Sequence, residues 1–161
     1  MKDPQKDSRS EPHPEDAGGW VTAHIGKQGF TTEVIAGAHK MTADEPFSVG
    51  GTDLGPTPYD YLLSALAGCT VMTLRMYADR KGWPLEGATV QLRSGRSHEK
   101  DCGTCETEKV GIGHIQRRIR LSGELTDDQQ KRLVAIADRC PIKQTLERGI
   151  HVQSVDSPAI S

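Results

Sequence analysis

The spacing of hydrophobic and polar residues predicts three short strands in the first part of the chain. Residues 20–25 and 30–36 are rich in strand-forming residues, and a Lys-Gln-Gly turn separates them, which is typical of a β-hairpin. Residues 39–42 predict a third strand. A loop rich in Gly and Pro follows over residues 44–58.

The clearest element is a long helix over residues 58–81. Thr57 fits the N-cap, Pro58 the first helical position and Asp60 the third, as in a capping box. Gly82 fits the end of the helix. Residues at three- and four-residue spacing form one apolar stripe: Tyr59, Leu62, Leu63, Leu66, Cys69, Thr73, Met76 and Tyr77. At 1.5 Å per residue the helix spans about 36 Å, enough to cross a small domain.

Two more strands and two shorter helices follow. Alternating apolar residues predict strands at 88–92 and at 110–121, with a phase slip near Gly113 that indicates a bulge. A capping box at residues 126–129 predicts a helix that runs to about Arg139.

Pro141 interrupts this helix and starts a shorter one, which ends at Gly149. Residues 150–155 then predict a closing strand. Runs of strands separated by helices indicate an α+β fold rather than an alternating parallel sheet.

The domain organisation follows from composition. Residues 1–17 are polar, charged and rich in proline, so they cannot bury enough surface to offset the entropy of ordering, and we expect a disordered tail. Residues 18–161 are long enough to bury one core, so we expect a single domain.

Charge and hydropathy narrow the function classes. The formal net charge is −2 and no cluster of Lys or Arg stands out, so no nucleic-acid partner is expected. No apolar run approaches the roughly 20 residues of a membrane span, and the first residues lack the apolar core of a signal peptide. We therefore expect a cytoplasmic protein without a membrane partner. In that reducing compartment the four cysteines are expected to be catalytic, redox-sensing or metal-binding.

Two of the cysteines are associated with helices. Cys69 lies on the apolar stripe, where a small buried side chain is the simpler interpretation. Cys140 falls at the N-cap before Pro141, where free backbone N–H groups and the helix dipole favour a thiolate, and Arg139 and Lys143 add positive charge. Local physics alone makes Cys140 the more reactive thiol, although a cysteine that only caps a kink has the same pattern.

The other two cysteines form a C-x-x-C motif, Cys102 and Cys105, in a polar loop that also holds His98. A tight turn lets both sulfurs reach one ion, so a zinc site is one interpretation. A redox-active dithiol or disulfide is the second, and an unliganded polar turn is the third.

Two segments together resemble one family. GPTPYDYLLSALAGCT, which contains Cys69, and ADRCPIKQTLERG, which contains Cys140, resemble the OsmC/Ohr family of thiol peroxidases. The DEPFSVGG loop adds to a likeness that covers residues 20–155, and the C-x-x-C insert resembles one OsmC-like subgroup. The resemblance implies a long central helix wrapped by antiparallel sheets in an intertwined homodimer, with active sites at the subunit interface.

The resemblance also implies a reaction. Cys69 attacks a hydroperoxide and becomes a sulfenic acid, Cys140 condenses with it to a disulfide, and an external dithiol, lipoamide-type or other, reopens the bond. No cofactor is required. This cycle is chemically sound because the thiolate is the nucleophile and a nearby thiol protects the sulfenic acid from over-oxidation.

The sequence departs from the family pattern around the attacking thiol. Members that reduce organic hydroperoxides use an Arg from the N-terminal strands and a Glu near the start of the long helix. Here no Arg occurs between residues 20 and 59, and Tyr59 or Asp60 takes the Glu position. The capping box explains Asp60 equally well. The remaining candidates for activating Cys69 are basic: Arg75, Arg139 and Lys143.

Three functional hypotheses follow. The first is a peroxidase that reduces organic hydroperoxides through Cys69 and Cys140. The second is a protein of the same fold that binds an apolar small molecule and has little peroxidase turnover, which the missing Arg motivates. The third is a metal or redox sensor that acts through Cys102 and Cys105.

Overall fold

The computed structural model describes residues 19–95 and 113–155. The described chain separates into two compact units, one ending at Tyr61 and one beginning at Leu62. The predicted tail and the C-x-x-C pair with His98 lie outside the described residues, and the single-domain assignment stays a prediction.

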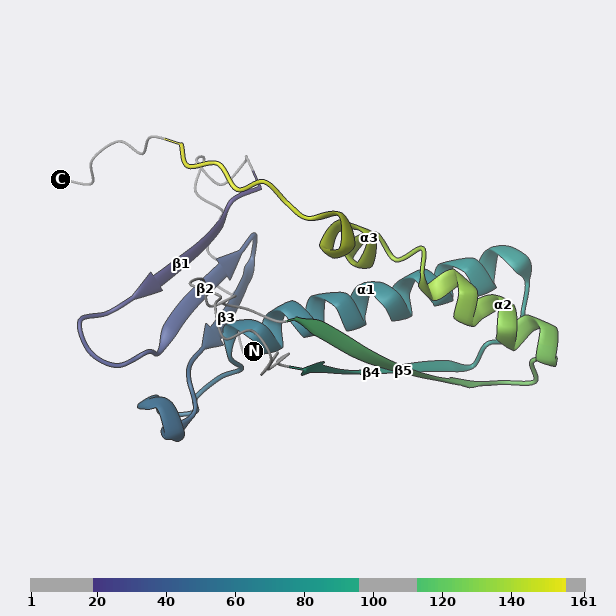
Figure 1. The fold of residues 1–161 in the computed structure, drawn as a ribbon, viewed down its shortest axis with the longest axis horizontal. Coiled ribbons are helices and arrows are strands. Elements are labelled where there is room, and N and C mark those ends of the chain that lie inside the picture. Colours follow the sequence, from purple (N-terminus) through teal and green to yellow (C-terminus); the bar gives the residue numbers. More distant parts are fainter. Residues whose placement is uncertain (1–18, 96–112, 156–161) are drawn as a thin grey trace, which may run out of the picture. The chain divides into compact units, whose positions relative to one another are not determined.

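The first unit contains a three-stranded antiparallel sheet in the order β1-β2-β3 (Figure 1). β1 (Val21–Ile25) pairs with β2 (Thr32–Ala36), which pairs with β3 (His39–Ala43). Both connections are short turns, so consecutive strands become neighbours. The three predicted strands are thus confirmed, and the short 3-10 helix η2 (Phe47–Val49) lies in the loop that follows.

A buried carboxylate organises that loop. Asp44, only 2% exposed, accepts hydrogen bonds from the backbone N–H groups of Glu45, Thr52 and Leu54 at 2.8, 3.2 and 3.2 Å. The hydroxyls of Thr52 and Thr31 donate to the same carboxylate at 2.6 and 3.3 Å. The Thr52 hydroxyl and these backbone donors outweigh the effect of burial and lower the pKa of Asp44 to about 2.

The long helix α1 (Pro58–Lys81) has the bounds that the sequence predicts. The backbone N–H of Asp60 donates to the Thr57 hydroxyl at 3.2 Å, and the N–H of Thr57 donates to the Asp60 carboxylate at 3.1 Å. This reciprocal pair satisfies donors that the first turn leaves free. Gly82, at φ 64°, adopts the left-handed conformation that ends the helix.

The second unit contains a two-stranded antiparallel sheet. Every residue of β4 (Gly87–Gly95) pairs with a residue of β5 (His114–Ser122). No bulge interrupts this ladder over the described residues, and Gly113, where the sequence predicts a phase slip, lies just before β5.

Two helices complete this unit. α2 (Asp127–Ala137) begins at the predicted capping box, in which Thr126 is the N-cap, and ends two residues before Arg139. α3 (Pro141–Arg148) begins at the proline that interrupts the helical run and ends at Gly149. Pro141 lacks the N–H that a continued helix would need, so the chain starts a new helix there.

The core of the second unit lies between the C-terminal half of α1, α2 and the β4–β5 sheet (Figure 1). Its fully buried members come from the two helices and the turn after α1: Leu74, Ala78, Leu85, Leu133, Ile136 and Ala137. Apolar side chains of β4 and β5 pack against this cluster, among them Ala88 and Ile119. Burial of each leucine or isoleucine side chain contributes roughly 1.5–3 kcal/mol, so this cluster fixes how α2 lies on α1.

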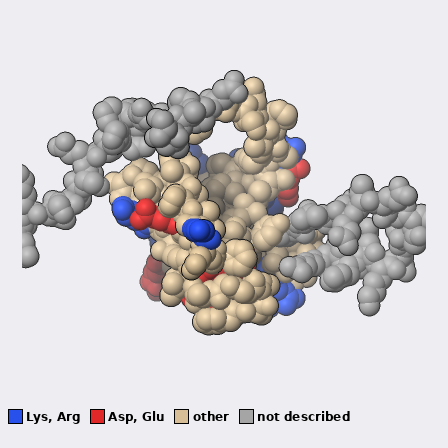
Figure 2. Space-filling view, turned by 90° about the vertical axis from the view of Figure 1, so that its left-hand side faces the viewer, with Lys and Arg blue, Asp and Glu red and all other residues tan. Residues whose placement is uncertain are grey.

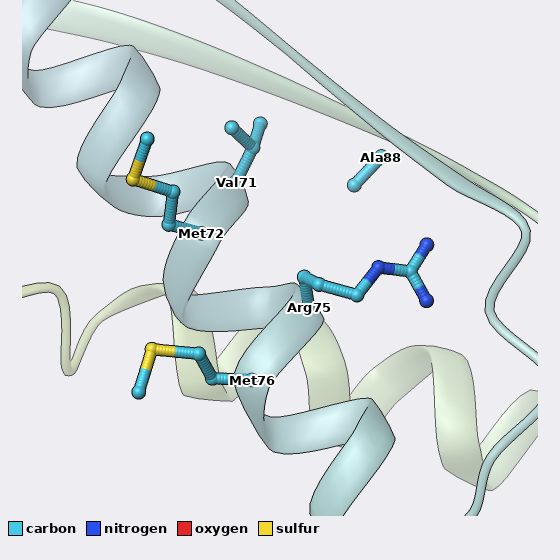
Figure 3. A pocket seen from close by; sticks show the side chains of 5 residues that line it. All are labelled: Val71, Met72, Arg75, Met76 and Ala88. Carbon is cyan, nitrogen blue, oxygen red and sulfur yellow. The ribbon is translucent and has the colours of Figure 1, made fainter.

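The buried face of α1 differs from the predicted stripe. Met76, placed on the stripe by the sequence, is 71% exposed, and Met72 is 66% exposed. Figure 3 shows both methionines projecting from α1 on the side away from Ala88 of β4. The buried positions instead follow a four-residue spacing: Leu66, Thr70, Leu74 and Ala78. Because α1 is apolar on more than one face, the pattern alone could not choose between them.

The predicted closing strand is wrong. Residues 150–155 form no strand in the structure, and Ile150, Val152 and Val155 are exposed. A strand needs a neighbour to accept its backbone hydrogen bonds, and alternating apolar residues do not supply one.

Hydropathy and charge agree with the sequence pattern. None of the helices among the described residues combines the length and the apolarity needed to cross a membrane. On the face drawn in Figure 2, positive and negative side chains are interspersed, and most of the visible surface is uncharged.

Candidate functional site

The second unit brings together the two cysteines that lie far apart in sequence. Cys69 is half-buried on α1, and Cys140 is completely buried before α3. Both are free thiols, and they lie close enough for each to shift the pKa of the other. This places two sulfurs where a disulfide could link α1 to the α2–α3 connection.

Cys140 is held at the break between two helices. Arg139 and Cys140 donate their N–H groups to the carbonyls of Ile136 and Ala137 at 2.9 and 3.3 Å, which closes the last turn of α2. The carbonyl of Cys140 then accepts from the N–H of Gln144 at 3.1 Å, which opens α3. Cys140 is therefore the N-cap of α3, a position at which the first N–H groups of the helix have no partner within the helix.

The surroundings of Cys140 favour its thiolate. Burial opposes ionisation, but the nearby backbone N–H groups of Lys143 and Ile142 and the Cys69 thiol outweigh it, so the pKa of Cys140 lies below its ordinary value. Hydrogen bonds to the charged form stabilise it, as at other helix N-termini.

The surroundings of Cys69 have the opposite effect. Burial is the largest contribution and, with the neighbouring Cys140, raises the pKa of Cys69, although the N–H of Ile142 and the Thr73 side chain act against this. The two shifts have opposite signs, so the deeper sulfur, Cys140, is the more acidic of the pair.

The predicted activating residues are engaged elsewhere. Asp60 is occupied with Thr57 in the helix cap, and with Tyr59 it belongs to the first unit. The Arg75 guanidinium donates to the backbone carbonyls of Leu85 and Glu86 at 2.6 and 3.3 Å and also pairs with Asp79. Figure 3 shows it extended from α1.

The two basic residues near Cys140 differ from each other. Arg139 is exposed at the helix break. Lys143 is half-buried, and its ammonium pairs with Asp138 at 3.7 Å and with Glu147 at 2.5 Å. What Lys143 offers to Cys140 is its backbone N–H.

Sequence reasoning missed Thr70 as a site residue. Its side chain is fully buried, its hydroxyl donates to the carbonyl of Leu66 at 2.7 Å, and it also contacts the Cys140 sulfur. Its place four residues after Leu66 and four before Leu74 was the available signal, since it puts Thr70 on the buried face.

An apolar groove opens next to the thiol pair. It has a volume of about 580 Å³, within the range of small-molecule sites. Its apolar lining comes from α1, both strands and α3: Leu62, Leu66, Leu92, Ile115 and Leu146. Charged side chains at its edge include Arg117, Lys143 and Glu147. Neither cysteine lines the groove, but Leu66 lies three residues before Cys69 and Lys143 lies three residues after Cys140.

The zinc prediction remains open. Within the described ranges, no group of three His, Cys, Asp or Glu side chains could hold a metal ion. The predicted ligands Cys102, Cys105 and His98 lie outside those ranges.

A long helix carrying one thiol, a helix break carrying the other and flanking antiparallel sheets define a class of α+β proteins with a paired-cysteine site. The family model described as OsmC-like protein matches residues 51–155, which include both cysteines. The chain belongs to the OsmC-like protein family.

Solved structures share this fold at low sequence identity. An OsmC-like protein from Mycoplasma pneumoniae is 22% identical with a TM-score of 0.65, and the match covers 82% of this chain and 89% of that one. The organic hydroperoxide resistance protein OsmC from Legionella pneumophila is 21% identical with a TM-score of 0.56, over 78% and 85% of the two chains.

An organic hydroperoxide resistance protein from Elizabethkingia anophelis, with thiocyanate bound, is 18% identical with a TM-score of 0.56, over 77% and 84% of the two chains. At these identities the likeness shows the fold. A comparison with curated protein sequences finds no match.

Proposed function

We propose that the protein is a thiol-dependent peroxidase that reduces organic hydroperoxides through Cys69 and Cys140. The observation that carries this proposal is the contact between a half-buried thiol and a buried, acidic one. Membership of the OsmC-like family and the fold shared with two organic hydroperoxide resistance proteins support it.

The difference in burial and acidity between the two thiols indicates the first step of the reaction. Cys140 is too deeply buried to meet a substrate, whereas Cys69 is reachable but is the less acidic thiol. Cys69 therefore gives its proton to the Cys140 thiolate as it attacks. Cys140 in this way replaces the Arg that the N-terminal strands lack, because it accepts the proton instead of stabilising the Cys69 thiolate by charge.

The remaining steps convert the hydroperoxide to an alcohol and the two thiols to a disulfide. The Cys69 thiolate attacks one peroxide oxygen, the O–O bond breaks, and Cys69 becomes a sulfenic acid. The alkoxide that leaves takes the proton from Cys140 and departs as an alcohol. The Cys140 thiolate then attacks the Cys69 sulfur and expels hydroxide, which leaves a disulfide. An external dithiol, lipoamide-type or other, reduces this disulfide and becomes a disulfide itself.

The groove favours a hydroperoxide with an apolar group. Its leucine and isoleucine lining can hold a hydrocarbon chain, and Leu66 in that lining lies one helical turn before Cys69. The need for a dithiol reductant fits a reducing compartment, so we place the protein in the cytoplasm.

A homodimer is part of the proposal. The exposed methionines at positions 72 and 76 leave an apolar face on α1, and Val71 and Arg75 border the same depression of about 470 Å³ (Figure 3). A second copy of α1 would cover such a face. Light scattering on the purified protein should give twice the monomer mass of 17.5 kDa.

The direct test is peptide mass mapping after one equivalent of cumene hydroperoxide, starting from fully reduced, metal-free protein. We expect a peptide pair linked through Cys69 and Cys140 and one equivalent of alcohol. A link confined to Cys102 and Cys105 would contradict the proposal, because the redox chemistry would then belong to the other cysteine pair.

A binding protein is the second candidate function. The volume and apolar lining of the groove favour it, independently of the sulfur chemistry. The double variant Cys69→Ser/Cys140→Ser should then retain full affinity for an apolar dye such as ANS. Wild-type protein that shows no hydroperoxide consumption while retaining the dye affinity would favour this candidate over the peroxidase.

A further inference from the structure

Arg117 occupies a position of β5 where an apolar residue is expected. Side chains of β5 alternate between exposed and half-buried, and Arg117 shares the half-buried face with Ile115, Ile119 and Leu121. Ile119 and Leu121 pack against the core. The side chain of Arg117 is only 19% exposed. A guanidinium in such a row is costly unless its donors are satisfied, so its partners indicate why it is there.

The partners of Arg117 lie at the end of α2. One guanidinium nitrogen donates to the carbonyl of Ala137 at 3.1 Å, and the other donates to the Asp138 carboxylate at 2.7 Å. The carbonyl of Ala137 also accepts from the N–H of Cys140 at 3.3 Å, so Arg117 adds a second donor at the end of α2. Arg117 therefore ties the helix break to the sheet with two charge-assisted hydrogen bonds.

The connection continues past Cys140. The Asp138 oxygen that accepts from Arg117 also lies 3.7 Å from the Lys143 ammonium, and Lys143 belongs to the first turn of α3, the helix that Cys140 caps. Residues on both sides of Cys140 are thus held by one carboxylate. We call Arg117, Asp138 and Lys143 the clamp.

We propose that Arg117 is the positioning residue of the thiol pair, fixing the α2–α3 break so that Cys140 stays in contact with Cys69 and with the N–H groups of α3. The inference rests on the proposed function for its catalytic meaning. Arg117 acts through Asp138 and the backbone, because its guanidinium is bonded to them rather than to a sulfur. A displacement of about 1 Å at such a site can cost roughly a hundredfold in rate.

The test compares Arg117→Gln with Arg118→Gln, which changes an exposed arginine on the opposite face of β5. Both are made in a background with Cys102→Ser and Cys105→Ser, so that thiolate absorbance reports only the pair. For Arg117→Gln we expect the first thiol ionisation to move to higher pH. Closure of the Cys69–Cys140 disulfide by diamide should also slow by at least about tenfold. This is less than the roughly hundredfold loss of rate that a displacement of about 1 Å can cause. Arg118→Gln should match the background in both measurements.

A second pair of variants keeps the test decisive. Arg117→Lys retains the charge but cannot make both hydrogen bonds. Its pH of thiol ionisation and its rate of disulfide closure should therefore lie between those of the background and of Arg117→Gln. The double variant Asp138→Asn/Arg117→Gln should slow disulfide closure no more than the more harmful of the two single variants, since the two residues act as one unit. The inference is overturned if the folded Arg117→Gln or Arg117→Lys protein ionises and closes its disulfide as the background does.

These readouts separate the two proposals. Ionisation and diamide closure do not require hydroperoxide turnover. A protein that reduces no hydroperoxide, yet loses thiol ionisation in Arg117→Gln, would retain the positioning role and lose the peroxidase assignment. A protein that reduces hydroperoxide, and whose thiol ionisation is unchanged in Arg117→Gln, would retain the peroxidase assignment and lose the positioning role of Arg117.

Discussion

The loop around Asp44 and the helix break around Cys140 each surround a buried acidic group with backbone N–H groups. In both, N–H groups from nearby residues in the sequence lower the pKa of that group, and at Asp44 the Thr52 hydroxyl adds to them. The difference lies in what ionises. A carboxylate is already charged at neutral pH, so stabilising it only strengthens the loop. A thiol ionises near neutral pH, so the same stabilisation changes its reactivity.

The two regions also differ in what is placed next to the anion. Asp44 is surrounded by its own loop, whereas Cys140 has a second thiol in contact and an apolar groove nearby. The comparison teaches that hydrogen-bond donors around one buried group do not by themselves indicate a reactive site. A reactive neighbour and access for a substrate are needed as well.

The largest effect is expected at the thiols. Cys69→Ser should abolish hydroperoxide reduction, and Cys140→Ser should leave a single turnover that ends in a sulfenic or sulfinic acid at Cys69. Steady-state turnover should fall by about a thousandfold or more in each variant, as when one member of a catalytic unit is removed. Alcohol production and the mass of the Cys69 peptide measure this, with circular dichroism to show that the fold is retained. Sustained turnover in Cys140→Ser would contradict the two-cysteine cycle.

An intermediate effect is expected from Asp44→Asn. The amide keeps the shape of the side chain but offers an N–H₂ group to donors that need an acceptor, so several loop hydrogen bonds are lost. We expect the melting temperature to fall by about 5 °C, the size of a modest loss of stability in a small protein. Asp53→Asn, an exposed change in the same loop, is the matched control and should melt like the wild type. Equal melting temperatures for the two variants would mean that Asp44 does not organise the loop.

The smallest effect is a pH dependence of stability. Because the pKa of Asp44 is lowered to about 2 from 3.8, the unfolded chain binds a proton at higher pH than the folded one. This contribution to stability is complete above about pH 4 and is lost as the pH falls toward 2. Urea unfolding between pH 5 and 2 should show the wild type losing stability faster than Asp44→Asn. Parallel curves for the two proteins would place the acid sensitivity elsewhere.

Local sequence signals predicted most element boundaries. Thr57, Pro58 and Asp60 set the start of α1, and Gly82 set its end, because each acts within one turn of its own position. The capping box at Thr126 located α2 for the same reason. The predicted strand over 150–155 failed because pairing depends on a partner that the sequence pattern does not contain.

The candidate site was only partly visible in the sequence. The position of Cys140 before Pro141 indicated an N-cap with free donors, and the resemblance to the OsmC/Ohr family paired it with Cys69. Thr70 and Arg117 were missed. Thr70 needed the correct buried face of α1, and Arg117 needed the packing of β5 against the end of α2.

By itself the sequence determined the helices, the antiparallel strands and the donors around Cys140, because these depend on backbone preferences and on groups a few residues apart. Only the tertiary structure decided which face of α1 is buried, how deeply each thiol is buried and what holds the helix break. Those properties depend on burial and on hydrogen bonds between segments distant in sequence, and both exist only once the chain has packed.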